Sequence, residues 1–240
     1  MANPRTYTSA VATPDGPFDI HVWIPDSGSG PGLLLVQEIY GVSEYIRAVA
    51  ADLAGLGYVV AAPDLFWRLQ PGWAARHDEE GLQQSLALAS RFDPATGVAD
   101  TVAAYRHLAG LPEVSGGTGI IGFCFGGTFA YLAAAQTSPD VVLSFYGSGV
   151  PDQLGLLASI SAPLQLHFGG SDAYIPRDAV RRVEEAAAGH PNVEVHVEEE
   201  AGHAFHNRKA PMFYQPAPAA RAWQRAEEFL RRHLPVRQPA

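Results

Sequence analysis

Residues 122–127, Gly-Phe-Cys-Phe-Gly-Gly, constrain the fold of this chain more than any other segment. An apolar run precedes them and an alanine-rich run follows, which predicts a strand, a sharp turn and a helix. On such a turn the positions two before and two after the central residue must be small, so that strand and helix can pass each other. Gly122 and Gly126 meet this need around Cys124. The segment has the form of a nucleophile elbow with cysteine at its tip; the alternative is a buried structural cysteine at a glycine-rich turn.

Strands and helices are predicted to alternate on both sides of this turn. Apolar and alternating runs predict strands at residues 18–24, 32–37, 58–62, 119–122, 141–146, 163–168 and 193–197. Helical spacing predicts helices at residues 43–56, 98–108, 126–136, 177–188 and 219–233. We expect 18–24 to be an antiparallel edge strand and 32–37 a buried central strand. The alternation predicts an α/β fold, a mostly parallel central sheet with helices on both faces and functional loops at the carboxyl ends of the strands.

Length and charge limit what the chain can be. Its 240 residues, 47% of them hydrophobic, predict one folded domain spanning 1–240. A formal charge of −9 argues against nucleic acid and anionic membrane surfaces as partners, because both attract Lys and Arg. The apolar runs are too short to span a bilayer, and residues 1–14 lack the apolar stretch of a secretory signal, so we expect a soluble cytoplasmic protein. A single cysteine allows neither an intrachain disulfide nor a multi-cysteine metal site.

Residues 64–93 fit no strand. They contain Pro71-Gly72 and two tryptophans, Trp67 and Trp73. The segment is expected to form either a short cap or wall over a site, or a surface excursion without function; no large cap domain is expected.

Two polar residues stand where they can join Cys124. Asp172 follows the strand predicted at 163–168, and His203 follows the strand predicted at 193–197. Each taken alone would be an ordinary loop residue. Together they give the chain order nucleophile, acid, histidine, which is typical of the α/β-hydrolase fold. We therefore predict Cys124 as nucleophile, His203 as base and Asp172 as the residue that orients the base; His206 is a competing base.

The loop at residues 37–41, Gln-Glu-Ile-Tyr-Gly, follows the predicted central strand. In this architecture such a loop supplies an N–H group to an oxyanion hole, here from Ile39, and the N–H of Phe125 on the elbow supplies the other. Glu38 is then placed at the mouth of the site. A carboxylate there is unexpected, because its charge opposes formation of a thiolate on Cys124. The alternative for Glu38 is a solvated loop acid.

The segments 37–41, 62–65, 122–127, 169–172 and 202–205 together resemble the dienelactone hydrolase (carboxymethylenebutenolidase) family of α/β-hydrolases, over nearly the whole chain. The resemblance implies a triad of Cys124, Asp172 and His203. It also implies that the oxyanion is bound by the N–H groups of Ile39 and Phe125. For Glu38 it implies an interaction with the resting cysteine that couples thiol activation to substrate binding.

The substrate does not follow from the resemblance. Members that act on dienelactone hold its carboxylate with two arginines, and Leu82 and Asn207 occupy these positions here. We therefore expect a neutral ester or lactone with an apolar part, although Arg208, Arg76 or Arg91 could replace a missing arginine. The substrate-binding residues and aromatic wall residues that we expect, beyond the triad, are Tyr40, Phe123, Phe205, Arg208, Phe125, Trp67 and Trp73.

The expected activity is that of an esterase which cleaves an ester or lactone through a cysteine acyl-enzyme. The expected partner is a small-molecule substrate, and the protein is expected to be a monomer or a small homo-oligomer. No cofactor and no metal are expected. His196 lies within the strand predicted at 193–197, and the triad accounts for His203. The alternative is a ligand-binding or redox-responsive protein of the same fold, with a reactive cysteine but no turnover.

Overall fold

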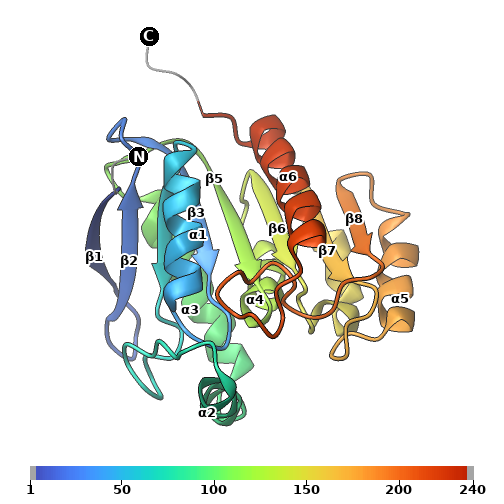
Figure 1. Cartoon of the computed structure of the whole chain (residues 1–240). Coiled ribbons are helices and arrows are strands. Elements are labelled where there is room, and N and C mark those ends of the chain that lie inside the picture. The colour runs from blue at the N-terminus through green and yellow to red at the C-terminus, as the bar shows by residue number, and fades with distance from the viewer. Residues whose placement is uncertain (1–3, 237–240) are drawn as a thin grey trace.

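The computed structural model describes residues 4–236 and contains one eight-stranded sheet (Figure 1). The strands are β1 (Arg5–Val11), β2 (Phe18–Ile24), β3 (Gly30–Val36), β4 (Val59–Pro63), β5 (Val114–Phe123), β6 (Val141–Phe145), β7 (Leu164–Gly169) and β8 (Val193–Glu198). The helices are α1 (Glu44–Gly55), α2 (Glu79–Ala89), α3 (Pro94–Ala109), α4 (Phe125–Ala134), α5 (Arg177–Ala187) and α6 (Pro216–His233). Two short 3-10 helices lie at Val150–Asp152 and Leu154–Ser159.

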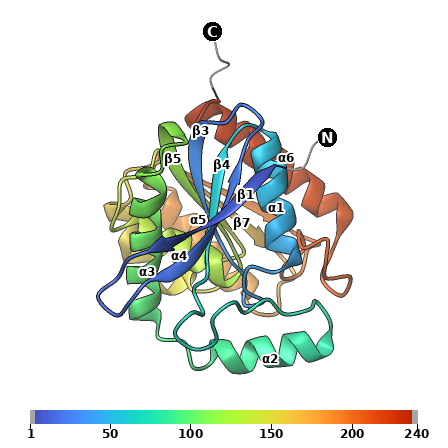
Figure 2. The ribbon, with the colours of Figure 1, turned by 90° about the vertical axis from the view of Figure 1, so that its left-hand side faces the viewer.

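The strand order is β1-β2-β4-β3-β5-β6-β7-β8. Strands β3 to β8 run parallel, whereas β1 pairs with β2, and β2 with β4, in antiparallel fashion. Helices α1 and α6 cover one face of the sheet, and α3 and α4 cover the other (Figure 2). The predicted α/β-hydrolase fold is confirmed.

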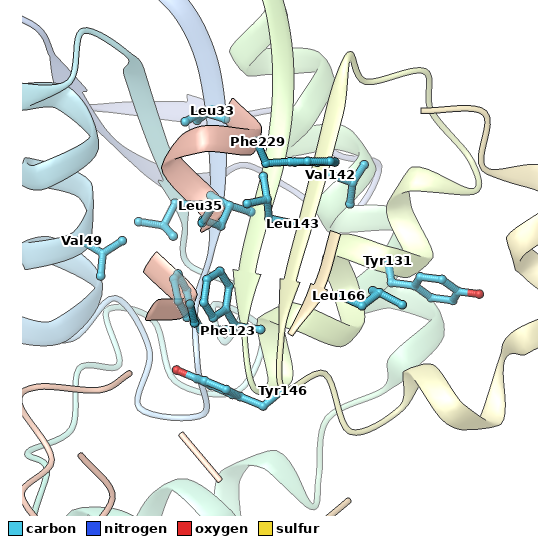
Figure 3. Packing of buried hydrophobic residues seen from close by; sticks show 14 of the residues in the cluster. Leu33, Leu35, Val49, Phe123, Tyr131, Val142, Leu143, Tyr146, Leu166 and Phe229 are labelled. Atoms are coloured by element: carbon cyan, nitrogen blue, oxygen red, sulfur yellow. The ribbon is translucent and has the colours of Figure 1, made fainter. Parts of the chain in front are cut away.

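Both faces of the central strand β3 are buried, which explains its continuous apolar run. Leu33 and Leu35 belong to one hydrophobic cluster, and Leu34 and Val36 belong to the second. Figure 3 shows residues of the first cluster, in which Leu35 lies among side chains from α1, β6 and α6. This two-sided burial places β3 inside the sheet, and the loop with Glu38 follows directly after its last residue, Val36.

One strand assignment was wrong. Residues 18–24 are antiparallel as predicted but are not at the edge, because β1 pairs along their other side in full register from Arg5 opposite Ile24 to Val11 opposite Phe18. Strand β1 carries mainly polar, solvent-exposed residues, so it gives little hydrophobic signal.

The segment 64–93 holds α2, which crosses below the carboxyl ends of the strands (Figure 2). Asp64 fixes the start of this segment, because its carboxylate accepts hydrogen bonds from the N–H of Phe66 at 3.1 Å and of Gly72 at 2.6 Å. Asp78 caps α2 by accepting from the N–H of Gly81 at 2.9 Å. Of the helices described, none is both long and apolar enough to cross a membrane.

Candidate active site

Cys124 lies on a strained turn between β5 and α4. Its backbone has φ 55° and ψ −117°, a conformation that residues with a side chain seldom adopt. A Cβ added at Gly122 would overlap the carbonyl oxygen of Gly126, and one added at Gly126 would overlap that of Val36. The structure therefore leaves no room for a side chain at positions 122 and 126, as inferred from the sequence. The turn places the sulfur, which is only partly buried, at the amino end of α4.

The structure brings Cys124, His203 and Asp172 into one hydrogen-bonded chain. The Nε2 atom of His203 lies 3.1 Å from Sγ of Cys124, and its Nδ1 atom lies 2.7 Å from Oδ2 of Asp172. The other oxygen of Asp172 accepts the N–H groups of Tyr174 at 2.7 Å and Ile175 at 3.2 Å. The Asp172 carboxylate is fully buried. It can therefore orient the imidazole while its own position is fixed by the backbone.

The charge state of His203 follows from these neighbours. Burial by itself lowers the pKa of the imidazole, but the negative charge on Cys124 and the hydrogen bonds to Asp172 and Cys124 together raise that pKa well above its ordinary value. The arrangement makes His203 a ready acceptor for the proton of Cys124, and transfer of that proton is the step that activates a cysteine nucleophile.

Backbone strain is concentrated around this histidine. Three residues other than glycine have positive φ in the described chain: Cys124, Tyr146 at 40° and Ala204 at 52°. Ala204 follows His203 directly, and the Tyr146 ring lies edge-on to His203 with a centroid distance of 5.3 Å. Strain of this kind persists only where the surrounding structure enforces it, and it is common at functional sites.

His206, the competing base, has other contacts. Its Nδ1 atom is hydrogen-bonded to the Tyr45 hydroxyl at 2.7 Å, and its ring stacks on Trp223 and Phe123. Burial, with a smaller contribution from the charge of Arg208, lowers the pKa of His206 to about 3. A neutral histidine packed in this way supports the loop, and His203 is the one that contacts the thiol.

The two predicted oxyanion donors come from different parts of the chain. Phe125 is the first residue of α4, where backbone N–H groups have no acceptor within the helix. Ile39 lies in a turn closed by a hydrogen bond from the N–H of Gly41 to the carbonyl of Glu38 at 3.0 Å. That bond holds the peptide that carries the Ile39 N–H, and the indole of Trp73 holds the next peptide by donating to the Ile39 carbonyl at 3.2 Å. Both residues line the pocket.

Glu38 is buried, so its interpretation as a solvated loop acid was wrong. Only 1% of the residue is exposed. Asn207 donates a hydrogen bond from Nδ2 to Oε2 of Glu38 at 2.7 Å, while Oε1 is without a hydrogen-bond partner among residues 4–236. Burial raises the pKa of Glu38 to about 8, against the opposing influence of the positive charge on His203 and of the Asn207 hydrogen bond. Glu38 is therefore a neutral acid at pH 7.

The pocket over Cys124 is small and mainly apolar. Its volume is about 180 Å³. It is lined by Glu38, Ile39, Tyr40, Leu82, Leu86, Cys124, Phe125, Ser148, Tyr174, His203, Ala204 and Phe213. Leu82 and Leu86 come from α2, so residues 64–93 do form a wall of the site. Within the part of the chain that the structure describes, no arginine or lysine lines this pocket.

Of the predicted substrate-binding and wall residues, Tyr40 and Phe125 line the pocket, whereas Trp67 and Trp73 are not among its lining residues. Phe123 and Phe205 are fully buried in the hydrophobic core instead. Arg208 points away from the site, because its guanidinium pairs with Asp52 on α1 at 2.6 Å. The predicted replacement of a missing arginine by Arg208 therefore has no support in the structure.

Some lining residues escaped the sequence analysis. Leu86 could have been found, because it is one helical turn after Leu82 on the same face of α2. Ser148 follows β6, and its place after a parallel strand is a weak signal. Phe213 lies in a long loop before α6, where no spacing rule applies. In the described chain no group of three or more His, Cys, Asp and Glu residues could hold a metal ion.

Comparison with known proteins gives the family of the chain. The sequence model of the dienelactone hydrolase family matches residues 18–234. The chain is 34% identical over 214 residues to a carboxymethylenebutenolidase of Pseudomonas putida, covering 89% of this chain and 90% of that protein. It is 32% identical over 222 residues to a carboxymethylenebutenolidase of Rhodococcus opacus, covering 88% and 84%.

The fold has known relatives as well. The crystal structure of a dienelactone hydrolase from Anabaena variabilis superposes with a TM-score of 0.72 at 21% identity, covering 97% of this chain and all of the other. These similarities support a hydrolase activity on lactone or ester substrates. The chain belongs to the dienelactone hydrolase family.

Proposed function

We propose that this protein hydrolyses a neutral ester or lactone through an acyl-enzyme on Cys124. The observation that carries the proposal is the chain of contacts from Cys124 Sγ to His203 Nε2 at 3.1 Å and from His203 Nδ1 to Asp172 at 2.7 Å. It lies on a turn that exposes the sulfur to an apolar pocket. This is the arrangement that nucleophilic catalysis requires.

The first half of the reaction forms the acyl-enzyme. His203 takes the proton of the thiol, and the sulfur attacks the carbonyl carbon of the substrate. The carbonyl oxygen becomes an oxyanion, which the N–H groups of Ile39 and Phe125 bind; a preorganised donor of this kind contributes about 3 kcal/mol. The bond to the leaving oxygen then breaks, and His203 returns its proton to that oxygen.

The second half releases the acid. His203 takes a proton from a water molecule, whose oxygen attacks the thioester carbonyl. The carbon–sulfur bond then breaks, and the proton passes from His203 back to Cys124. Asp172 fixes the tautomer of His203 and stabilises the imidazolium in both halves.

Glu38 is assigned the role that the family resemblance implies, an interaction with the resting cysteine that links thiol activation to substrate binding. Its burial and its free Oε1 beside the pocket support this role. A neutral acid can lie near the sulfur without opposing a thiolate, which resolves the objection raised by the sequence.

A neutral substrate is favoured by the lining of the pocket. An anionic group would meet an apolar wall of Leu82, Leu86 and Phe213 with no arginine or lysine to balance it. Asn207, at the position of the second family arginine, is engaged with Glu38. The hydroxyl of Tyr40 stays protonated at neutral pH, because burial raises its pKa above the ordinary value.

The test is burst and steady-state hydrolysis of a short-chain p-nitrophenyl ester beside a dienelactone-type carboxylate substrate, with mass spectrometry to locate the acyl group. Acylation of Cys124 and turnover of the neutral ester alone are expected. Cys124→Ala should abolish turnover, and an unchanged rate in this variant would exclude Cys124 as nucleophile. A thiol that reacts once without turnover would instead favour the ligand-binding or redox-responsive alternative.

A further inference from the structure

Asn207 is held at both ends of its side-chain amide. Its Nδ2 donates to Oε2 of Glu38 at 2.7 Å, and its Oδ1 accepts the N–H of Lys209 at 3.0 Å. The second bond fixes which end of the amide is the donor, because a backbone N–H cannot accept. Asn207 is fully buried, so water does not compete for either bond. The amide is therefore a rigid donor aimed at one oxygen of Glu38.

The other oxygen of Glu38 is left free, in contact with neither Asn207 nor any other hydrogen-bond partner in residues 4–236. A buried polar atom without a partner is uncommon in folded proteins and calls for an explanation. Both Glu38 and Cys124 line the pocket, and the charge of His203 acts on Glu38. The free oxygen is thus available to the reacting groups rather than to the fold.

We propose that Asn207 is a positioning residue of this site, whose amide holds Glu38 by Oε2 and so keeps Oε1 free for the thiol and the substrate. Its effect on catalysis rests on the proposed function, but the positioning itself does not. Asn207 contacts no reacting atom and acts through Glu38.

The neutral amide of Asn207 affects the protonation of Glu38. A cation there would stabilise the carboxylate strongly, whereas an amide stabilises it modestly. His203 and the hydroxyls of Tyr40, Tyr45 and Tyr146 interact electrostatically with Glu38, and Cys124 lines the same pocket. With a single cationic neighbour, His203, the acid remains protonated up to about pH 8.

The experiment follows Glu38 directly in the full-length protein. Carbon NMR of protein labelled at the glutamate carboxyl groups gives its titration midpoint, and Glu38→Gln identifies its signal. Asn207→Leu removes the donor at similar volume, and we expect the midpoint to rise by about 1 pH unit, because a hydrogen bond to the ionised form is lost. Asn207→Asp sets a second carboxyl against the first, and the pair should keep a shared proton to higher pH still.

Asn192→Leu is the matched control. Asn192 also donates twice from a side-chain amide, to the carbonyls of Ile160 and Ala162 at 2.9 Å each, but it lies at the amino ends of β7 and β8, away from the site. It should lose stability without moving the Glu38 midpoint. A midpoint in folded Asn207→Leu and Asn207→Asp equal to that of the wild type would overturn the proposal.

Activity is the second measurement. In Asn207→Leu we expect kcat/KM for the neutral ester to fall about tenfold, mainly through kcat. The reason is that Glu38 is no longer held in place for the step in which the thiol reacts. An unchanged kcat with a shifted midpoint would show that Glu38 is positioned but does not act in the reaction. If the wild type hydrolyses no ester, the midpoint still decides whether Asn207 positions Glu38, so the two proposals fail separately.

Discussion

The elbow and α2 face each other across one pocket but are built in opposite ways. The elbow has glycines with no room for a Cβ and a cysteine in a strained conformation, all packed against the ends of β3 and β6. Helix α2 buries only Gly81, Ser85 and Leu88, and its Leu86 is 39% exposed. Polar side chains on its outer side pair with each other, such as Gln83 with Glu79 at 3.0 Å.

We infer from this difference that the elbow and α2 affect different properties of the enzyme. Dense packing fixes atoms to within the tolerance that bond formation needs, whereas a lightly packed helix can change its side chains at little cost in stability. Substitutions on the elbow side should therefore change kcat or the fold. Substitutions on α2 should change KM and substrate preference.

The largest effect is expected at Asp172. Asp172→Asn keeps the shape of the side chain but favours the wrong tautomer of His203, so kcat should fall about a thousandfold or more. Steady-state kinetics on the neutral ester measures this, and the thermal midpoint should remain close to that of the wild type. A fall of less than tenfold would mean that Asp172 only supports the loop at Tyr174 and Ile175.

The next effect is on stability. Gly126→Ala forces a Cβ into the carbonyl oxygen of Val36, so the elbow must open, and we expect a loss of about 3 kcal/mol in the free energy of unfolding. Gly55→Ala is the control, since a Cβ there meets nothing within 4 Å. Urea unfolding of both variants measures their free energies of unfolding. Equal stabilities would show that the elbow is not the rigid side of the pocket.

Glu38 also belongs to the rigid side, and its burial predicts a pH dependence of stability. Its pKa is about 8 in the fold against 4.5 for the free group. The folded state thus binds more protons between these values, and its stability falls as pH rises through that window. Glu38→Gln should remove this slope and be more stable than the wild type by about 2 kcal/mol at pH 6, with the difference growing up to about pH 8. If the free energies of unfolding of the two proteins changed with pH in the same way, the raised pKa of buried Glu38 would be contradicted.

The sequence predicted the rigid side better than the lightly packed one. The central strands are buried on both faces and so read as apolar runs, and the glycines of the elbow report a steric need. Asp172 and His203 could be predicted to lie near Cys124 because a parallel sheet brings the ends of its strands together, and the structure places the three in contact. The partner of Arg208 could not be found, because Asp52 lies on α1, far away in the chain. Phe213 was missed because a loop has no periodicity to reveal which side chain turns inward.

The smallest effect is expected on α2. Leu86→Ser should raise KM about threefold for an ester with a larger apolar acyl group, with kcat nearly unchanged, because a single wall contact is lost. Leu56→Ser is the matched control, since Leu56 is 42% exposed but lies after α1 outside the pocket. A fall in kcat for Leu86→Ser, with KM constant, would show that α2 affects the chemical step and not substrate binding. The two walls would then have to be treated as one unit that fixes the substrate together.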